Sequence, residues 1–348
     1  MVCGIYLIPR ISINPLPDEK KVRHENMEEL LKIEDLSVVF RTGGATAKAV
    51  NHLNLIVNKG EAVGLVGESG AGKTTTALAV LKLLQKQVGY YTGGDIIFDG
   101  ESVLKKSEKE MTHIRGNRVA MIFQNPLTSL NPTFTVGHQI EMVLRKHRNM
   151  TKKQAMEEAG RLLNMVGIAE YRLKDYPHQF SGGMRQRVGI AAALACSPEL
   201  LIADEPTTAL DVTIQAQILE LMKQLQKEYK TSLIMITHNL GIIAELCQKV
   251  AIMYGGEIIE YGTVKEVFTN PQHPYTIGLL NAIPTLNSTQ ERLNGIPGNV
   301  ANSHDLPAGC KFHPRCGECL ETCKGAHPPM IRLDDNHYAA CWAREEQP

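Results

Sequence analysis

The sequence lacks a long hydrophobic run, an excess of one charge and an internal repeat. No window of its 348 residues approaches the roughly 20 apolar residues that a membrane-spanning helix needs. The N-terminus has no cationic start, and Pro9 and Pro15 interrupt its short apolar stretch, so we expect no signal peptide and a chain that remains in the cytosol. Lysine plus arginine and aspartate plus glutamate both number 37, which argues against a general nucleic-acid-binding protein because such proteins usually carry a basic face.

A glycine-rich segment at residues 67–74 fits the phosphate-binding pattern GxxxxGK[ST]. It follows an apolar run at 62–66 that predicts a buried strand, and precedes a segment rich in Ala and Leu at 74–84 that predicts a helix. Glycines allow several backbone N–H groups to point at one phosphate, which the helix N-terminus also faces. Lys73 adds a charge for the β- and γ-phosphates, and Thr74 offers a hydroxyl to Mg²⁺. The predicted nucleotide-binding residues here are Gly67, Glu68, Ser69, Gly70, Ala71, Gly72, Lys73, Thr74 and Thr75.

Two adjacent acidic residues follow a second predicted strand. Residues 200–203 form a continuous apolar run, as expected for a buried parallel strand, and Asp204 and Glu205 come directly after it. Mg²⁺ prefers hard oxygen ligands, so we expect Asp204 to hold this ion directly or through water. Glu205 lies one residue further, where it can polarise the attacking water as a general base. Paired acids at a strand end can also be simple surface residues, but the phosphate loop upstream favours the catalytic interpretation.

The order of the remaining patterns predicts an α/β domain with an inserted helical subdomain. Residues 1–27 have no clear period, and we interpret them as an extension of uncertain order. Strand-like runs within residues 31–57, separated by a Gly-Gly turn, predict an antiparallel edge. Residues 135–195 lack strand signals and have helical periodicity, with Thr151 and Gln154 in the pattern of a capping box.

The segment at residues 180–187, which begins Phe-Ser-Gly-Gly-Met, separates classes of nucleotide hydrolase. Few have Ser-Gly-Gly at a predicted helix start shortly before an Asp-Glu strand. Here the chain resembles the ATP-binding subunits of ABC (ATP-binding cassette) transporters, whose usual signature is LSGGQ. The resemblance implies a RecA-like P-loop core with an antiparallel β subdomain and an inserted helical subdomain. It also implies a head-to-tail dimer in which the signature contacts the γ-phosphate of ATP on the partner. The signature residues are Ser181, Gly182, Gly183 and Met184.

Further positions match the same family. The resemblance implies that Gln124 reaches Mg²⁺ and the attacking water, and that His238 contacts the γ-phosphate as a switch histidine. Asp211 matches the D-loop at the dimer interface. Phe40 is the candidate for stacking on adenine, although residues 41–48 are longer than the usual turn; a core phenylalanine is the alternative. The predicted catalytic residues are Glu205, His238 and Gln124.

Longer segments resemble the importers of oligopeptides, dipeptides and nickel within this family. These segments are residues 124–132, 176–180, 203–217 and 270–276. The resemblance covers about residues 30–345. We expect a nucleotide-binding domain at 28–268, with its helical subdomain at about 125–195, and a cysteine-rich C-terminal extension at 269–348.

The importers of this branch are assemblies, so the resemblance also implies partners. The signature looks more like that of the "D" member of paired ATPases, which implies a heterodimer with a paralogous ATPase subunit; a homodimer is the alternative. Two transmembrane permease subunits and, indirectly, an extracytoplasmic solute-binding protein complete the implied assembly, with no nucleic acid. The chain is then expected as a peripheral protein at the cytoplasmic face of the plasma (inner) membrane, where it hydrolyses ATP to import peptides or a related small solute such as nickel.

Two rival interpretations come from other classes. A soluble ABC ATPase that is not coupled to transport usually carries tandem cassettes or long coiled coils. An iron–sulfur redox protein regulated by ATP needs a second cofactor site or a substrate pocket. The sequence indicates none of these features.

Five of the eight cysteines fall in the last 39 residues, beyond the point near Asn270 where Pro, Gly and Cys become frequent. Clustered cysteines in a reducing compartment more often bind metal than form disulfides. Four thiolates suit an Fe–S cluster or Zn²⁺, and a CxxC pair at 316–319 could instead join His313 or His327 around zinc. Free thiols are the third alternative. The spacing resembles the four-cysteine pattern of the same importers, which implies a [4Fe-4S] cluster. The implied ligands, which leave out Cys319, are Cys310, Cys316, Cys323 and Cys341.

Overall fold

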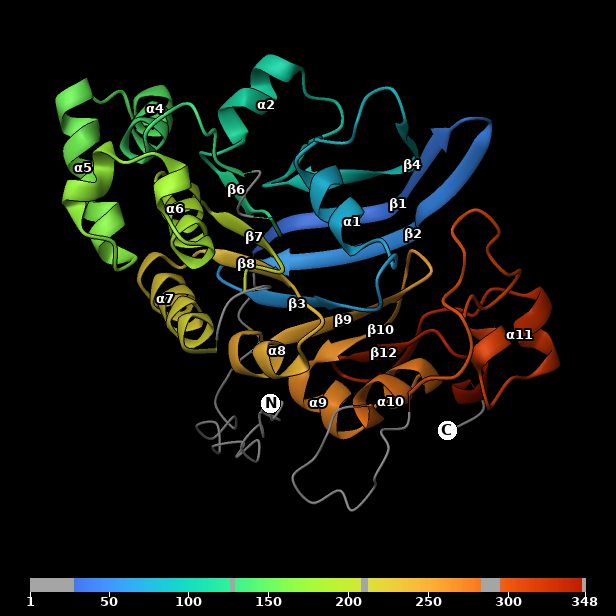
Figure 1. The fold of residues 1–348 in the computed structure, drawn as a ribbon. Coiled ribbons are helices and arrows are strands. Elements are labelled where there is room, and N and C mark those ends of the chain that lie inside the picture. Colours follow the sequence, from blue (N-terminus) through green and yellow to red (C-terminus); the bar gives the residue numbers. More distant parts are fainter. Residues whose placement is uncertain (1–27, 126–128, 208–211, 283–294, 346–348) are drawn as a thin grey trace.

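The structure is a computed structural model that describes residues 28–125, 129–207, 212–282 and 295–345. Two β-sheets carry helices around them (Figure 1). The N-terminal extension at 1–27 lies outside the described residues. Within the described part, no helix is both long enough and apolar enough to cross a membrane.

The first sheet is antiparallel and is built mainly from one long hairpin. Ile33 pairs with Leu55 and Phe40 with Ala47, in the antiparallel arrangement that the strand-like runs predict. The predicted Gly-Gly turn closes the hairpin. The described strands of this sheet, in sheet order, are β2 (Ala45–Asn58), β1 (Glu29–Thr42), β4 (Gly89–Phe98) and β5 (Glu101–Ser102).

The second sheet has a parallel centre that carries the predicted nucleotide-binding elements. Every residue of β3, β7 and β8 is buried, which explains why their sequences are continuous apolar runs instead of alternating ones. The predicted strands at 62–66 and 200–203 are therefore present. In sheet order the described strands are β11 (Ile331–Asp334), β12 (His337–Ala339), β10 (Glu257–Thr263), β9 (Lys249–Tyr254), β3 (Ala62–Val66), β8 (Ser232–Ile236), β7 (Leu200–Asp204) and β6 (Val119–Ile122).

The C-terminal segment continues this sheet. Glu260 of β10 pairs with Ala339 of β12 in antiparallel register. The buried Glu260 carboxylate accepts hydrogen bonds from the backbone N–H groups of Gln272 (2.7 Å) and His273 (2.8 Å). It also lies 2.8 Å from His337 Nε2. The segment after residue 270 is thus joined to the core by both strand pairing and a buried polar network.

Helices α4, α5 and α6 gather in one lobe, in the region where the sequence predicts helices without strands (Figure 1). Helix α5 begins at the predicted capping box: Thr151 Oγ1 accepts from Gln154 N–H, and Gln154 Oε1 accepts from Thr151 N–H. The described α-helices are α1 (Lys73–Val80), α2 (Glu108–Ile114), α4 (Val136–Arg148), α5 (Lys152–Met165), α6 (Gly182–Leu194), α7 (Val212–Tyr229), α8 (Leu240–Leu246), α9 (Val264–Thr269), α10 (Pro274–Asn281) and α11 (Glu321–Gly325).

Helix α1 ends at Val80, before the Leu84 end that the sequence predicts. Lys82 adopts a left-handed backbone conformation (φ 52°), which cannot continue an α-helix. Its Nζ donates to the carbonyls of Leu104 and Lys106, so tertiary contacts hold this bend. Four short 3₁₀ helices are also described: η2 (Glu170–Lys174), η3 (Pro177–Gln179), η4 (His313–Arg315) and η5 (Trp342–Arg344).

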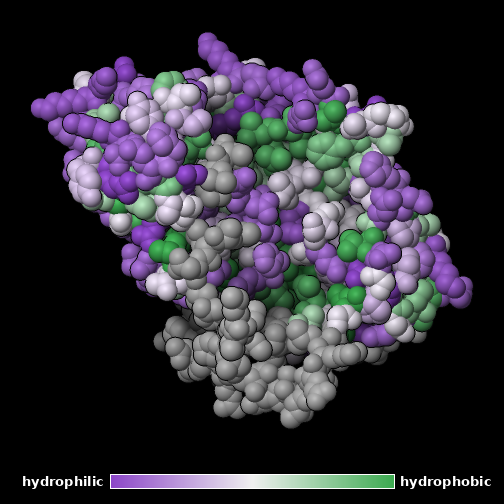
Figure 2. All heavy atoms as spheres, viewed as in Figure 1, coloured by the Kyte–Doolittle hydropathy of each residue, from purple (hydrophilic) through white to green (hydrophobic). Residues whose placement is uncertain are grey.

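The surface character differs between two regions of the face that Figure 2 shows. Figure 2 shows mostly hydrophilic residues over the lobe of α4 and α5, whereas hydrophobic residues gather around α1 and β4. Leu83 and Tyr90 are exposed large hydrophobic residues in the latter region.

Candidate nucleotide-binding site

The phosphate loop connects β3 to α1 and is tightly enclosed by other backbone segments. Gly72 has a left-handed conformation (φ 98°), and a Cβ there would lie 2.3 Å from the carbonyl oxygen of Ala49. A Cβ on Gly67 would lie 2.3 Å from the carbonyl oxygen of Met253. Only glycine fits at these two positions, so the glycines of the motif have a steric reason as well as a chemical one.

Lys73 folds back over the loop. Its side chain is buried, and Nζ donates to the carbonyls of Gly67 (2.7 Å) and Glu68 (2.9 Å). Burial lowers the pKa of Lys73, while the carboxylates of Glu205, Asp204 and Glu68 act in the opposite direction. The ammonium group is therefore held at the centre of the loop, where the sequence predicts a phosphate contact.

Two oxygen-bearing side chains meet beside Lys73. Asp204 is the last residue of β7 and is 2% exposed. Burial raises the pKa of Asp204, whereas its hydrogen bond with the exposed Thr74 hydroxyl lowers this pKa. A hydroxyl and a carboxylate are the donors expected for Mg²⁺. The chemistry of this pair therefore fits the ion.

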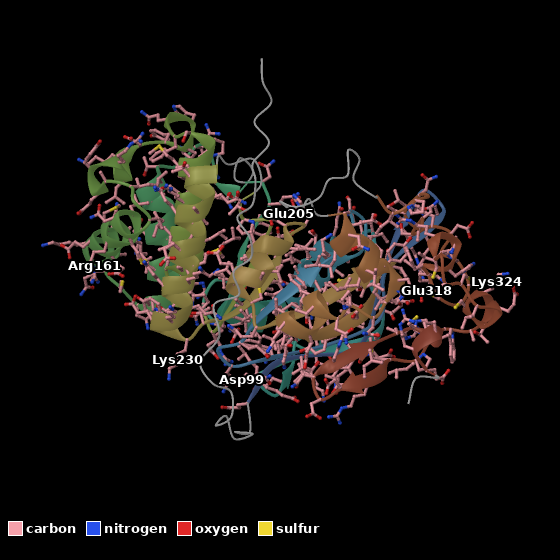
Figure 3. All side chains as sticks on the ribbon, turned by 90° about the horizontal axis from the view of Figure 1, so that it is seen from below. Asp99, Arg161, Glu205, Lys230, Glu318 and Lys324 are labelled. Carbon is pink, nitrogen blue, oxygen red and sulfur yellow. The ribbon has the colours of Figure 1, made fainter. Side chains whose placement is uncertain are left out.

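Two of the three predicted catalytic residues contact the carboxylate of the third, Glu205. Gln124 Nε2 donates to Glu205 Oε2 at 2.9 Å, and His238 Nδ1 lies 3.3 Å from Glu205 Oε1. These residues follow the ends of β6, β7 and β8, which are parallel, so their carboxyl ends share one edge of the sheet. Figure 3 shows Glu205 between the helical lobe, which carries Arg161, and the C-terminal segment, which carries Glu318.

The backbone around Glu205 fixes this arrangement. Glu205 has a left-handed conformation (φ 46°), which is uncommon outside glycine and turns the chain directly after the strand. Its N–H still donates to the Ile236 carbonyl at 2.8 Å, which extends the pairing of β7 with β8 by one residue. The Glu205 side chain is 16% exposed, so it is accessible to a water molecule from one side.

Comparison with known proteins agrees with this geometry. Residues 50–208 match a family model described as "ABC transporter", and residues 259–323 match "Oligopeptide/dipeptide transporter, C-terminal region". The oligopeptide transport ATP-binding protein OppD of Bacillus subtilis (strain 168) is 50% identical over 316 residues, which cover 90% of this chain and 88% of the relative. Its namesake in Escherichia coli (strain K12) is 48% identical over 325 residues, which cover 93% and 96%.

The chain belongs to the ABC transporter family. A solved dimeric ATP-binding cassette in a post-hydrolysis state, bound to ADP and Pi, is similar to 68% of this chain and 99% of its own, with a TM-score of 0.62 and 28% identity. CbiO1 of Clostridium perfringens, part of an ABC transporter complex, gives a TM-score of 0.59 at 26% identity, over 72% and 95% of the two chains. The predicted ABC ATPase fold and family are confirmed, and the protein is an ATPase that uses ATP and Mg²⁺.

The predicted signature of this ABC ATPase lies at the start of α6. Ser181 is the N-cap, and its Oγ accepts from the N–H of Met184 at 3.3 Å. Gly182 is exposed and Gly183 half-buried, so this helix N-terminus opens outward. α6 belongs to the helical lobe and not to the region around α1 (Figure 1). The signature therefore lies apart from the phosphate loop of its own chain.

The other predicted site residues lie on β1, on the phosphate loop, in α1 or outside the described residues. Phe40 lies on β1, is half-buried, and would be 3.1 Å from a Cβ at Gly89, so it packs beside the sheet core. Its adenine-stacking role stays a prediction. Asp211 of the D-loop lies outside the described residues. Ser69 and Gly70 are exposed on the phosphate loop, and Thr75 lies in the first turn of α1.

Two residues that contact the phosphate loop of this ABC ATPase, Tyr275 and Arg315, were not predicted from the sequence. Glu68 N–H donates to the Tyr275 hydroxyl at 2.9 Å, and the Glu68 carboxylate pairs with Arg315. Tyr275 lies in the segment at 270–276, which resembles the peptide and nickel importers. That resemblance indicated the branch of the family but gave no role for the tyrosine. No local sequence pattern indicated a role for Arg315, because its partner, Glu68, is distant in the sequence.

The C-terminal cysteines gather in one region. Cys310 and Cys323 are joined by a backbone hydrogen bond of 2.9 Å. Burial raises the pKa of Cys310 to about 12 and that of Cys316 to about 11, and the thiols of Cys341 and Cys323 act in the same direction on both. Cys310, Cys323 and Cys341 are buried and Cys316 is half-buried.

Among the residues that the structure describes, no group of three or more His, Cys, Asp or Glu side chains is placed to hold a metal ion. The histidines of the zinc alternative have other partners: His313 Nδ1 lies 2.9 Å from the Cys310 carbonyl, and His327 Nε2 lies 2.8 Å from Glu257 Oε2.

Proposed function

We propose that this ABC ATPase powers the import of oligopeptides or dipeptides through a membrane permease. One observation carries the proposal: residues 259–323 match the C-terminal region of oligopeptide/dipeptide transporters, outside the cassette common to the wider family. The relatives named for oligopeptide transport are similar over about the whole chain. A related small solute such as nickel is the alternative cargo.

In the proposed mechanism the chain's own residues bind the triphosphate and move one proton. Lys73 and the loop N–H groups bind the β- and γ-phosphates. Thr74 and Asp204 would hold Mg²⁺, which neutralises charge on the phosphates when bound. Glu205 accepts a proton from the attacking water, whose oxygen bonds to the γ-phosphorus as the bond to ADP breaks. Gln124 and His238 orient the water and the γ-phosphate around Glu205.

A head-to-tail dimer completes this site. The exposed start of α6, with Ser181 and Gly182, presents N–H groups and a hydroxyl to a phosphate that its own loop does not bring near. The similarity to a dimeric cassette bound to ADP and Pi supports this arrangement. The partner is a paralogous ATPase subunit, with a second copy of this chain as the alternative.

The assembly that follows is peripheral to a membrane. Two transmembrane permease subunits receive the closing motion of the dimer at the cytoplasmic face of the inner membrane, and an extracytoplasmic solute-binding protein delivers cargo. In this proposal residues 28–268 form the nucleotide-binding domain, with the helical subdomain at about 125–195. Residues 269–348 form the cysteine-rich extension.

The four C-terminal cysteines are proposed to ligate a [4Fe-4S] cluster. Such a cluster uses four thiolates, each bound to a different iron, so the sulfurs need not converge on one point as they do around zinc. Burial and then the thiols of Cys323, Cys316 and Cys341 raise the pKa of Cys310, so the four cysteines are near enough to interact electrostatically. The raised thiol pKa values mean that loading must displace protons from buried thiols.

The transport proposal is tested by gentle affinity purification of the tagged chain from native membranes in ATP. The expected result is co-purification of a permease pair with a second, related ATPase, and peptide uptake by the same assembly in vesicles. A matched sample carrying Glu205→Gln should retain the same partners but show no uptake. A soluble assembly, or ribosomes, would support the rival ABC ATPase that is not coupled to transport.

The cluster proposal is tested by changing one predicted ligand and one neighbour. Cys316→Ser should lose most of the iron and acid-labile sulfide, because a serine hydroxyl is a poor ligand for iron at neutral pH. Cys319→Ser, at a cysteine outside the proposed ligand set, is the control and should keep both. Full iron content in Cys316→Ser, or zinc in place of iron in the native protein, would contradict the assignment.

A further inference from the structure

The second residue of the phosphate loop, Glu68, is held by the C-terminal segment. Arg315 makes a two-pronged ion pair with its carboxylate: Nη1 lies 2.7 Å from Oε2, and Nη2 lies 3.2 Å from Oε1. The Glu68 N–H donates to the Tyr275 hydroxyl at 2.9 Å. Lys73 Nζ donates to the Glu68 carbonyl. Each polar group of Glu68 thus has a partner, and two of these partners lie outside the cassette motifs.

The Arg315 guanidinium also makes hydrogen bonds to groups other than Glu68, and these hold it in place. Its side chain is 4% exposed. Nε donates to the Pro297 carbonyl at 2.9 Å, and Nη2 lies 3.3 Å from the Ile296 carbonyl. Nη1 also lies 3.3 Å from the Tyr254 hydroxyl. A planar group with five donors satisfies this set of acceptors, whereas a lysine ammonium would not.

The Tyr275 hydroxyl is fixed by packing. Tyr275 is fully buried, and its ring centroid lies 4.8 Å from that of Tyr254 and 5.4 Å from that of Phe312. Tyr254 and Phe312 are also in contact, at 5.3 Å. The rings of Tyr254 and Phe312 therefore hold Tyr275, whose hydroxyl accepts from the loop N–H, and Phe312 lies three residues before Arg315.

We infer that Arg315 and Tyr275 are positioning residues that hold the phosphate loop in its ATP-binding shape. A loop ordered before ATP arrives binds it more tightly, because less conformational freedom is lost on binding. Arg315 also neutralises Glu68, whose carboxylate would otherwise repel the triphosphate. The inference rests on the proposed ATP site and is independent of the transported solute.

The test measures ATP affinity and hydrolysis with the full chain in its native assembly. Arg315→Ala should raise the KM and the Kd for ATP about tenfold, the effect of losing one charge-assisted pair, while kcat changes less than about twofold. Arg315→Lys should recover only part of the affinity. Tyr275→Phe, which removes a hydroxyl and keeps the ring, should raise the KM by a smaller factor.

A second change separates charge repulsion from general damage. Glu68→Gln in the Arg315→Ala background should restore part of the ATP affinity, because it removes the unneutralised carboxylate. Arg332→Ala is the matched control, since it breaks an exposed ion pair with Asp335 in the same extension, away from the loop. It should leave both KM and kcat unchanged.

Each outcome has one meaning. If the native chain binds no ATP, the proposed site fails. If it binds ATP and both Arg315→Ala and Tyr275→Phe bind equally well, only the positioning role fails. A loss in kcat without a change in KM, or no rescue by Glu68→Gln, would also overturn it.

Discussion

At the scale of single residues, the proposed chemistry of the site depends on the Glu205 carboxylate. Gln124 and His238 contact its two oxygens. Glu205→Gln keeps the shape of the side chain and removes its ability to accept a proton. We expect ATP to bind as before and phosphate release to slow by about 10²–10⁴-fold, the usual contribution of a general base. Nucleotide binding and phosphate release measured on the same sample check this.

A carboxylate at the opposite end of the same strand provides the control. Glu199 precedes β7 and pairs with Arg118, away from the phosphate loop. Glu199→Gln should hydrolyse ATP at the native rate. If Glu205→Gln also keeps a near-native rate, Glu205 is not the base.

Some residues of the site follow from local sequence and others do not. Lys73, Asp204 and Glu205 could be predicted because a strand followed by a glycine loop or by an acidic pair places them at one sheet edge. Arg315 could not be predicted, because its role depends on a tertiary contact with Glu68 that no spacing in the chain encodes.

At the scale of elements, local capping chemistry predicts where a helix begins. Thr151 and Gln154 form a capping box at the start of α5. Thr151→Ala should lower the free energy of unfolding by about 1 kcal/mol, because the backbone N–H of Gln154 loses its partner. Chemical denaturation checks this value, and Thr151→Ser should recover most of it. An equal loss in both variants would contradict a capping role.

Features that depend on tertiary contacts are harder to predict from the sequence. The end of α1 at Val80 depends on the left-handed Lys82, whose ammonium reaches carbonyls on another segment. Likewise, nothing in the Pro- and Gly-rich sequence after Asn270 indicates that β12 will pair with β10. Both features depend on surfaces that form only when distant segments fold together.

At the scale of the whole molecule, one sheet connects the ATP site to the C-terminal extension. The parallel strands β7 and β8 end directly before or close to the predicted catalytic residues Glu205 and His238, and β9 and β10 connect this part of the sheet to β12. Glu260 on β10 binds the segment that leads to Tyr275, which in turn holds the phosphate loop. The extension is therefore part of the framework that shapes the site.

This junction should make the stability of the molecule depend on pH. His273 is buried against Phe312, and burial lowers the pKa of His273 to about 4, although the nearby Glu260 acts in the opposite direction. Below about pH 6.5 the unfolded chain binds a proton that the folded chain does not, so stability falls as the pH falls from there towards 4. His273 should therefore contribute a loss of about 2 kcal/mol between pH 7 and pH 5.

Urea unfolding of the native chain and of His273→Gln at both pH values measures this contribution, since titrations elsewhere cancel in the difference. His273→Gln should be less stable than the native chain at pH 7, because it loses native packing, but should lose less stability on going to pH 5. His304→Gln, at an exposed position, should follow the native chain at both pH values. Equal losses in the native chain and His273→Gln would mean that His273 takes up its proton in the folded state, and that the junction opens to water.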